Sequence, residues 1–524
     1  MSGISVAEAP DRGQTIATAQ APVAAFFGRA SAGPVNTPVC ITHFTAFERL
    51  FGHAGDAPLA LALQQFFDHG GQNAVVVRIA NGATAGVIEL PGAGAPLRLQ
   101  IRNPGSGERL RASIDDDGLA DRPDAFNLTL QRLGIDGTRI IDQELFPALS
   151  MAADEVRFVA RALEDSALVR LAAGPLPSTR PKPMRPGMVD AAIGYVGMAE
   201  TGSDGSLLSD YDLIGSDHAG TGLFALDAVP QVDFIWFASA DCQVDPGPAL
   251  VVAAEQYCQR RNAMLVLDPP RGCDSVAALI DARQRQPLAG PNSLLYYPPV
   301  YDRDGHAGRR VSAAGALIGL LCRADTRTEV WTSLADTGDL GSAALRRRWL
   351  PSEALVADDA THLLRLGVNP LVSNTTRQLL FPGLVTAANL SDKTRGSLTL
   401  QRLTKFILRQ VDMGTRWALF VPPGNARDAD VEAQVGEFLA SLADAGAFRS
   451  APDHPGWWVR AESVLDCDKP DGDDSLTDNH RAALRVLLGF HPQQLASPLM
   501  YLMTVRTDGT VVTRAAVGSG MAAK

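Results

Sequence analysis

Two aspartates occupy positions at which α/β enzymes place their chemistry. Asp241 and Asp268 follow predicted strands at 232–238 and 263–267, and such enzymes bind their ligands at the carboxyl ends of parallel strands. A serine hydrolase also needs a nucleophile and a base, commonly with the serine in a G-x-S-x-G turn. The sequence contains no such pattern, and a strand-end aspartate before proline, as at Asp268, is more often a turn or a cap. The sequence therefore disfavours catalysis.

Two polar clusters have the residue types of a metal site without its spacing. Asp302, Asp304 and His306 lie beside Gly305 and Arg309 in a predicted exposed loop. An acidic stretch follows nearer the C-terminus, at Asp466, Asp468, Asp471, Asp473, Asp474 and Asp478. It fails the D-x-[DN]-x-[DN]-G calcium register because Pro470 stands where the third ligand should be. Solvated loops are expected at both places.

Composition excludes several other classes of function. The formal charge of −11 over 524 residues argues against sequence-independent nucleic-acid binding, which depends on a basic surface. No apolar run approaches the roughly 18 residues that span a bilayer, and residues 1–5 lack the features of a signal peptide. The six cysteines form no C-x-x-C pair, which suits a reducing cytoplasm. No phosphate loop of the form G-x-x-x-x-G-K-[ST] is present, so no nucleotide or other cofactor is expected.

The elements that would position these residues form an α/β pattern. The polar, Ala-rich residues 1–22 predict an arm, and a buried strand follows at 23–28. A capping box of Thr45 and Glu48 predicts a helix start, a second helix begins after Asp56, and a β-branched strand follows at 74–79. From 232 the pattern alternates, with helices at 249–260 and 275–285 and a further strand at 293–297. Connections of this length permit parallel strands with helices over the sheet.

Two further regions differ from this central layer, which is assigned to 23–81 and 186–373. Residues 82–185 alternate in short strands separated by Gly, Asp and Pro, which predicts an inserted, mostly β domain. Residues 374–497 predict a second α/β region with a helix at 398–411, a strand at 417–421, a helix at 431–442 and a strand at 457–460. Residues 498–524 predict terminal strands at 499–505 and 510–515.

The helix at 398–411 carries a row of cations. Leu400, Leu403, Ile407 and Val411 form its apolar face, and Arg402, Lys405 and Arg409 share another face. Two interpretations remain open: the basic face contacts an acidic patch on a partner, or it is a solvated helix side, as charge runs usually are.

Many short stretches along the chain have residues that are more distinctive than the secondary structure they predict. They are PVNTPV (34–39), FTAFERLFG (44–52), PLALA (58–62), QFFDHGG (65–71), VVVR (75–78), FPALSM (146–151), VRFV (156–159), SALVRL (166–171), LVLDPP (265–270), GALIG (315–319), RAD (323–325), VW (330–331), LGVNPL (366–371) and RWALFVPPGN (416–425). Together they resemble the contractile phage tail sheath proteins of myophage-like particles and related contractile injection systems. The resemblance covers nearly the whole chain.

This resemblance implies a fold and a function. The fold would be multidomain α/β: a central parallel-sheet domain that is subtilisin-like but not catalytic, an inserted β-rich domain, and a C-terminal α+β domain with extended terminal arms. The chain would be a structural subunit, not an enzyme. It would polymerise around the inner tail tube and contract to drive the tube through a target envelope.

The resemblance also implies partners and contact residues. The chain would bind other copies of itself in stacked, hexameric rings, together with the inner tube protein, baseplate proteins and a tail terminator, and would be assembled in the bacterial cytoplasm. Its terminal strands would extend the sheets of neighbouring copies by β-augmentation. The strand residues expected in these contacts are Ile4, Val6, Met500, Leu502, Val505 and Val511. Arg402, Lys405 and Arg409 would contact the tube or a neighbour.

Two departures from the family pattern leave an alternative open. Sheath proteins usually carry a Trp-Gly-Ala-Arg-Thr-Leu-like stretch before the C-terminal helix, whereas residues 381–387 read FPGLVTA, and the chain continues past the usual last strand to Lys524. A specialised sheath-like baseplate or cap protein, or a non-contractile relative, is the second interpretation. A subtilisin-like hydrolase is a remote third.

Overall fold

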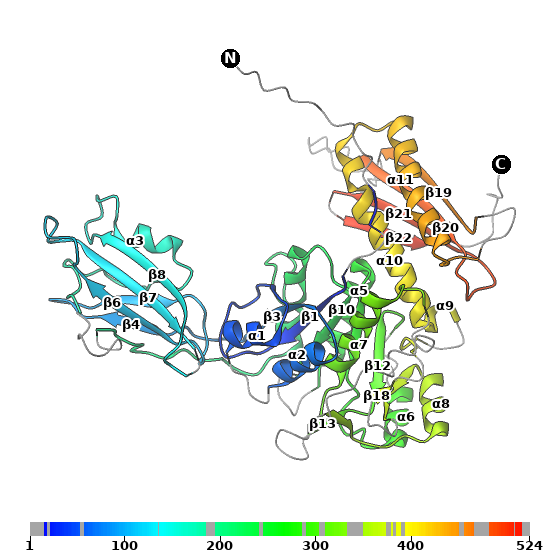
Figure 1. Ribbon diagram of the computed structural model, residues 1–524, viewed down its shortest axis with the longest axis horizontal. Coiled ribbons are helices and arrows are strands. Elements are labelled where there is room, and N and C mark those ends of the chain that lie inside the picture. The colour runs from blue at the N-terminus through cyan, green and yellow to red at the C-terminus, as the bar shows by residue number, and fades with distance from the viewer. Residues whose placement is uncertain are drawn as a thin grey trace, which may run out of the picture.

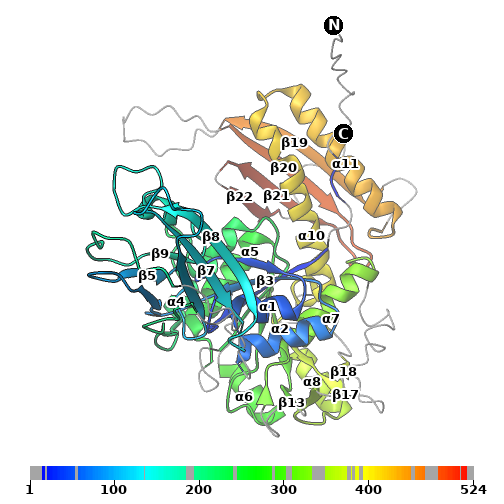
Figure 2. The ribbon, with the colours of Figure 1, turned by 60° about the vertical axis from the view of Figure 1, so that its left-hand side comes forward.

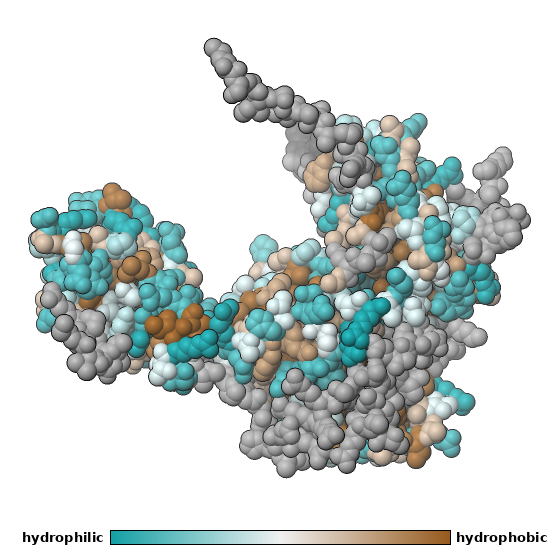
Figure 3. Space-filling view, viewed as in Figure 1, coloured by the Kyte–Doolittle hydropathy of each residue, from teal (hydrophilic) through white to brown (hydrophobic). Residues whose placement is uncertain are grey.

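The protein has three parts that follow one another in space. The structure is a computed structural model, and it describes residues 15–17, 21–52, 57–134, 136–184, 194–239, 245–285, 290–302, 310–332, 349–373, 379–380, 384–388, 393–449, 455–465, 482–507 and 509–515. Figure 1 shows a β-rich lobe at one end, a central α/β layer, and a C-terminal unit of helices over a sheet. Figure 3 shows that a narrow neck joins the β-rich lobe to the rest. The architecture is therefore mixed α/β with several sheets, as predicted.

The central sheet is almost entirely parallel. Its seven strands lie in the order β16-β12-β11-β10-β1-β3-β2. Their bounds are β1 (Val23–Gly28), β2 (Val39–Ile41), β3 (Asn73–Arg78), β10 (Phe234–Phe237), β11 (Met264–Leu267), β12 (Ser293–Tyr297) and β16 (Val368–Pro370). β2 alone is antiparallel to its neighbour. The predicted parallel layer is therefore confirmed, and buried side chains on both faces explain its continuous apolar strands.

Helices cover both faces of this sheet, so alternate residues of β1 enter different cores. Ala24 and Phe26 pack with α1 (Phe44–Phe51), α2 (Pro58–Asp68) and α7 (Ala314–Arg327) on one side. Ala25 and Phe27 pack with α4 (Asp210–Ile214), η2 (Gly222–Ala228) and α5 (Pro248–Arg261) on the other. A third cluster holds α6 (Val276–Arg285) and α8 (Ala357–Arg365) against β12 and β16.

The predicted capping box at the first helix is wrong. Helix α1 begins at Phe44, His43 is at its N-cap, and no side chain caps it. The Phe47 ring stacks on the rings of Phe44 and Phe51, with centroid distances of 5.9 and 5.4 Å. The three rings thus form a row that starts at the first residue of the helix. Packing of these rings therefore outweighs the local capping preference of Thr45.

The inserted lobe consists of two three-stranded antiparallel sheets. One has the order β4-β5-β9 and the other β6-β7-β8. Their bounds are β4 (Val87–Leu90), β5 (Leu97–Ile101), β6 (Leu110–Asp115), β7 (Phe126–Leu133), β8 (Ile140–Leu149) and β9 (Val169–Leu171), with α3 (Val159–Ala162) and η1 (Leu163–Asp165) beside them. The returning chain pairs back through Val196 and Glu200. The lobe therefore continues beyond residue 185, the expected limit.

Short elements lie around the central layer, and α9 precedes the C-terminal unit. They are β13 (Val300–Asp302), β14 (Arg310–Val311), β15 (Trp349–Pro351), β17 (Val372–Ser373), β18 (Leu379–Leu380) and α9 (Lys393–Gly396). Of the stretch that departs from the family pattern, 384–387 are described. The Ala387 amide donates to the Ser293 carbonyl at 2.8 Å, and the Thr386 amide donates to the Gly396 carbonyl at 3.0 Å. This stretch therefore ties strand β12 to the segment that precedes the C-terminal unit.

The C-terminal unit places helices on one face of a four-stranded antiparallel sheet. Its elements are α10 (Leu398–Thr415), η3 (Arg416–Phe420), α11 (Asn425–Asp444), β19 (Trp457–Leu465), β20 (Ala482–Phe490), β21 (Leu499–Arg506) and β22 (Gly509–Arg514). The sheet order is β19-β20-β21-β22. Leu398, at the start of α10, packs in the central core, whereas Trp331 packs in the C-terminal core.

Two sequence predictions in this unit differ from the structure. The strand predicted at 417–421 is the 3₁₀ helix η3, because Ala418 and its neighbours continue directly from α10 into the same core. A short apolar run cannot by itself separate these two conformations. Strand β20 was not predicted, although the alternation of Leu484, Val486 and Leu488, all buried, is the pattern of a half-covered strand.

Helices α2 and α7 approach unusually closely through two glycines. A Cβ on Gly315 would lie 2.0 Å from the Ala62 carbonyl oxygen, and one on Gly319 would lie 2.5 Å from that of Phe66. Backbone atoms cannot move aside as a flexible side chain can. The spacing of four residues places both glycines on the face of α7 that meets α2.

We expect Gly315→Ala to destabilise the protein by about 1–3 kcal/mol, the usual effect of overpacking, because the added methyl group forces the two helices apart. Urea unfolding followed by circular dichroism measures the change. Gly197→Ala is the matched control, since a Cβ there meets open space. Equal stability of the two variants would contradict the close-packing interpretation.

Candidate functional site

The three cations of α10 lie at the joint between the central layer and the C-terminal unit. Arg402, Lys405 and Arg409 are 5, 6 and 8% exposed, and Figures 1 and 2 show α10 running from the C-terminal sheet to the central layer. The solvated helix side is therefore wrong, because the row is buried and faces the central layer. The contact of these residues with a tube or a neighbour stays a prediction.

Each arginine of this row has a carboxylate partner. Arg402 pairs with Asp325 near the end of α7. Arg409 pairs with Asp233 at 2.5 Å, and Asp233 also accepts a hydrogen bond from the Val23 amide at 2.8 Å. Asp233 thus links the start of β1 to α10. These pairs surround a cavity of about 270 Å³ that also borders Asn262 and Glu329.

Lys405 has a different environment. Its Nζ donates to the Cys258 carbonyl oxygen at 3.4 Å, at the end of α5. Burial lowers its pKa to about 8; Cys258 and Glu255 oppose this shift and Arg409 adds to it. Burial likewise lowers the pKa of Arg402, to about 10. The joint therefore holds one cation whose charge is weakly compensated.

The predicted contact strands at the C-terminus pair within their own chain. β21, with Met500, Leu502 and Val505, lies between β20 and β22. Both edges of β21 are thus occupied, so these three residues cannot add to a neighbour's sheet in this conformation. Val511 lies on the edge strand β22 and is 55% exposed. Ile4 and Val6 lie outside the described residues.

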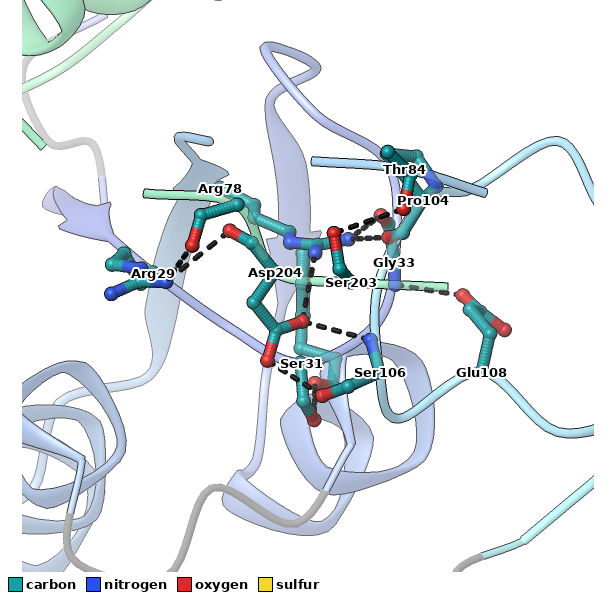
Figure 4. A network of polar contacts seen from close by, with 12 residues as sticks. Arg29, Ser31, Gly33, Arg78, Thr84, Pro104, Ser106, Glu108, Ser203 and Asp204 are labelled. Carbon is teal, nitrogen blue, oxygen red and sulfur yellow. Dashed lines mark hydrogen bonds and ion pairs between the residues drawn. The ribbon is translucent and has the colours of Figure 1, made fainter. Parts of the chain in front are cut away.

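A second charged network attaches the inserted lobe to the central layer (Figure 4). Arg78, at the end of β3, is fully buried and donates to the Gly33 carbonyl at 2.6 Å and the Pro104 carbonyl at 2.5 Å. Asp204 lies 3.7 Å from its guanidinium and accepts from the Ser106 amide and hydroxyl at 2.9 and 2.6 Å. Burial lowers the pKa of Arg78, and Asp204 opposes that shift. The network joins both strands of the neck to the sheet.

Glu108 extends this network into the lobe. Its carboxylate accepts from the Gly33 amide at 2.8 Å and from two nitrogens of Arg132 at 2.9 and 2.8 Å. Arg132 in turn donates to the Leu50 carbonyl at 2.9 Å. The lobe is therefore attached through side chains that are themselves buried or nearly so. An arginine that ends a wholly apolar strand, as Arg78 does, is a sequence signal that could have predicted such an anchor.

Asp268 lies at the carboxyl end of β11, beside a cavity of about 380 Å³. Its carboxylate accepts from Trp236 Nε1 at 3.1 Å, from Ser312 Oγ at 2.6 Å, and from the Tyr296 hydroxyl. Burial raises the pKa of Asp268, against these three hydrogen bonds. The described residues around the cavity include no histidine or lysine that could act as a base for Ser312. Asp268 is therefore a partly buried polar anchor between neighbouring strands. Asp241 lies outside the described residues.

Comparison with known proteins gives no match by sequence and strong matches by structure. Neither the family models nor the curated proteins contain a match. The sheath tail protein of Listeria innocua superposes with a TM-score of 0.62 at 13% identity, over 94% of this chain and 96% of the other. That of Desulfitobacterium hafniense gives 0.53 at 12% identity, over 97 and 100%. A sheath of an extracellular contractile injection system, PVC, in the contracted state gives 0.52 at 11% identity, over 95 and 95%.

This chain has the tail sheath fold. The mixed α/β sheath fold that the sequence resemblance implied is confirmed, since these likenesses extend over nearly the full length of both chains. The buried joint of α10 and the neck around Arg78 are thus two of the places at which this sheath fold connects its three parts.

Most residues of the two metal-like clusters of the sequence lie outside the part of the chain that the structure describes. Among the described residues, no group of three or more His, Cys, Asp or Glu is placed to hold a metal ion. Asp302 is buried, whereas Asp304, His306 and the acidic stretch from Asp466 to Asp478 lie outside the described residues. None of the described helices combines the length and the hydropathy needed to cross a lipid bilayer.

Replacing Lys405 with Met should stabilise the protein at neutral pH. The pKa of Lys405 is lowered on folding from 10.5 to about 8, so between these values the unfolded chain binds more protons and stability rises with pH. Below pH 8 the Lys405 ammonium group is charged in the folded protein as well, and its burial lowers the free energy of unfolding by the full amount. We expect Lys405→Met to raise the free energy of unfolding at pH 7 by roughly 1–3 kcal/mol and to flatten the rise between pH 8 and 10.5.

Urea unfolding across this pH range tests the expectation. Lys182→Met, at an exposed position, is the control. A stability loss at pH 7 in the Lys405 variant alone would show that the ammonium group has a partner stronger than the Cys258 carbonyl.

Removing Arg78 should loosen the inserted lobe. Arg78→Met leaves the Gly33 and Pro104 carbonyls and Asp204 without their buried donor, which we expect to destabilise the protein by about 3 kcal/mol. Limited proteolysis should then cleave both strands of the neck, near residues 81–86 and 200–206, and release the lobe. Arg98→Met removes an arginine whose side chain is 41% exposed and should change stability by less than about 1 kcal/mol. Equal protease resistance of the two variants would rule out the anchoring role of Arg78.

Proposed function

We propose that this chain is the structural subunit of a contractile tail sheath, which polymerises around an inner tail tube and contracts to drive the tube through a target envelope. The likeness to the Listeria innocua sheath tail protein over 96% of that chain's length carries the proposal. In such a machine the work comes from a metastable extended lattice that relaxes to one with greater contact between subunits. No nucleotide is consumed.

The proposed partners follow from this role. Other copies of the chain form stacked hexameric rings, and the inner tube protein, baseplate proteins and a terminator bind the resulting cylinder. Assembly takes place in the bacterial cytoplasm, with neither nucleic acid nor a membrane as a partner. The central parallel sheet is the subtilisin-like domain of this family in a non-catalytic form, an assignment supported by the three hydrogen bonds that engage Asp268.

Strand exchange at the chain ends is the proposed means of connection. The strand containing Ile4 and Val6 would extend the C-terminal sheet of a neighbouring copy, since backbone hydrogen bonds hold two subunits without fixing their domain orientation. On the acceptor side, β22 with Val511 is an edge strand. Ile16 supports this route, because it packs in the C-terminal core and a Cβ on Gly414 would lie 2.5 Å from its Cγ1. The described residues 15–17 thus lie against this unit.

A specialised baseplate or cap subunit is the second candidate. It is favoured by the departure from the family pattern at 381–387, because residues 385–387 of this stretch connect the central layer to the start of α10. A changed connection at this place would alter how far the two parts can rotate.

Deleting residues 1–13 should abolish polymerisation and leave the monomer folded. The deletion removes Ile4 and Val6 and keeps Ile16 in its core site. We expect the full-length protein to form hollow tubes or stacked rings in negative-stain micrographs, and the shortened protein to remain monomeric with an unchanged circular dichroism spectrum. Tubes that form and shorten without residues 1–13 would refute the strand exchange. Full-length protein that never polymerises would favour the specialised subunit.

A further inference from the structure

The two edge strands of the C-terminal sheet, β19 and β22, differ in whether side chains accept hydrogen bonds from the backbone amides that point away from the sheet. In an antiparallel ladder, residues that bond to the neighbouring strand alternate with residues whose N–H and C=O groups point away from it. The His491 amide donates to the Gly456 carbonyl at 2.8 Å, next to the β19–β20 ladder. Trp458, Arg460 and Glu462 therefore bond to β20. Val459, Ala461 and Ser463 point their amides away from the sheet.

Two of these outward amides bond to carboxylates of α11. The Ala461 amide donates to Glu432 Oε1 at 2.8 Å, and the Ser463 amide donates to Asp428 Oδ2 at 2.9 Å. The Ser463 hydroxyl also donates to Asp428. Asp428 and Glu432 are one helical turn apart, and α11 lies along β19 in both views (Figures 1 and 2). Their spacing therefore matches every second residue of the strand.

The opposite edge has no such arrangement. The Ala515 amide donates to the Met500 carbonyl at 2.9 Å, so Thr510, Val512 and Arg514 are the outward-facing residues of β22. Within the described residues, no carboxylate accepts from the amide of Thr510 or of Val512. The Thr510 side chain donates to Asp412 of α10, which places the start of β22 against that helix. Val512 lies further along the strand.

We propose that Asp428 and Glu432 close the β19 edge to strand addition by another copy of this chain and leave β22 as the edge that a neighbouring copy extends. This inference rests on the proposed function, because it specifies where strand exchange between copies takes place. An exposed strand edge is a template for unwanted pairing, and side-chain charges are a recognised protection. Here the protection is direct: an incoming strand must first displace two charge-assisted hydrogen bonds.

Replacing both carboxylates should open the edge. In D428A/E432A, we expect the peptide spanning residues 459–464 to exchange its amide hydrogens at least about tenfold faster in the monomer, the factor for losing a hydrogen bond to a charged acceptor. We also expect concentration-dependent dimers and larger species in sedimentation velocity. D430A/E437A removes the same charge from exposed positions of the same helix and should change neither readout.

A suppressor variant shows whether the new association uses this edge. Val459→Pro removes an outward-facing amide without touching the β19–β20 ladder, as proline can on an edge strand. Added to D428A/E432A, it should return the protein to a monomer. Should D428A/E432A not fold, D428N/E432Q keeps the side-chain size and is measured in the same way.

The outcomes separate this inference from the proposed function. Association of D428A/E432A that Val459→Pro suppresses supports the closed edge. Monomeric D428A/E432A, or association that persists with Val459→Pro, overturns it. All of these measurements use unassembled protein, so they decide the inference even where wild-type protein forms no tubes, a result that would count against the proposed function alone.

Discussion

The connection between the central layer and the C-terminal unit depends on opposite charges that are buried between α10 and the central layer. Arg409 and Asp233 lie 2.5 Å apart with side chains 10 and 15% exposed, and Asp233 also holds the start of β1. A buried ion pair stabilises little against an apolar pair of the same shape, but breaking it leaves an uncompensated charge. Helix α10 therefore keeps one position over the sheet, and Lys405 is retained there at a cost.

The inserted lobe is held by the same kind of interaction at the other end of the layer. Arg78 and Glu108 join the neck to the sheet through buried hydrogen bonds, and Asp204 adds a more exposed one. In the proposed sheath, both connections let a subunit turn as a unit, while the exchanged strands carry the link between copies. Because a neighbouring copy is proposed to add its strand at β22 and not at β19, each C-terminal sheet in the polymer is extended from one edge only.

Most of the fold could be predicted from the sequence, because its signals are local. The strands at 232–238, 263–267 and 293–297 and the helices at 249–260 and 275–285 match β10, β11, β12, α5 and α6 within a few residues, since apolar runs bounded by turns mark buried strands. The tail sheath resemblance came from short stretches of sequence, and the structural likeness to sheath tail proteins agrees with it. Residues 417–421 were predicted wrongly because a short apolar run alone does not separate helix from strand, whereas the alternation that marks β20 is present in the sequence.

The site residues were decided only by the tertiary structure. Arg402, Lys405 and Arg409 share a face in any helix over these residues, but whether that face meets solvent or Asp233 and Asp325 depends on residues at least 77 positions away. Likewise, Met500, Leu502 and Val505 have the alternation of a strand in either case, and only the pairing of β21 with β20 and β22 places them inside the sheet. The sequence by itself determined which residues form strands and helices and which face of each is apolar, because these depend on neighbouring residues. What each face and edge meets depends on contacts distant in the chain.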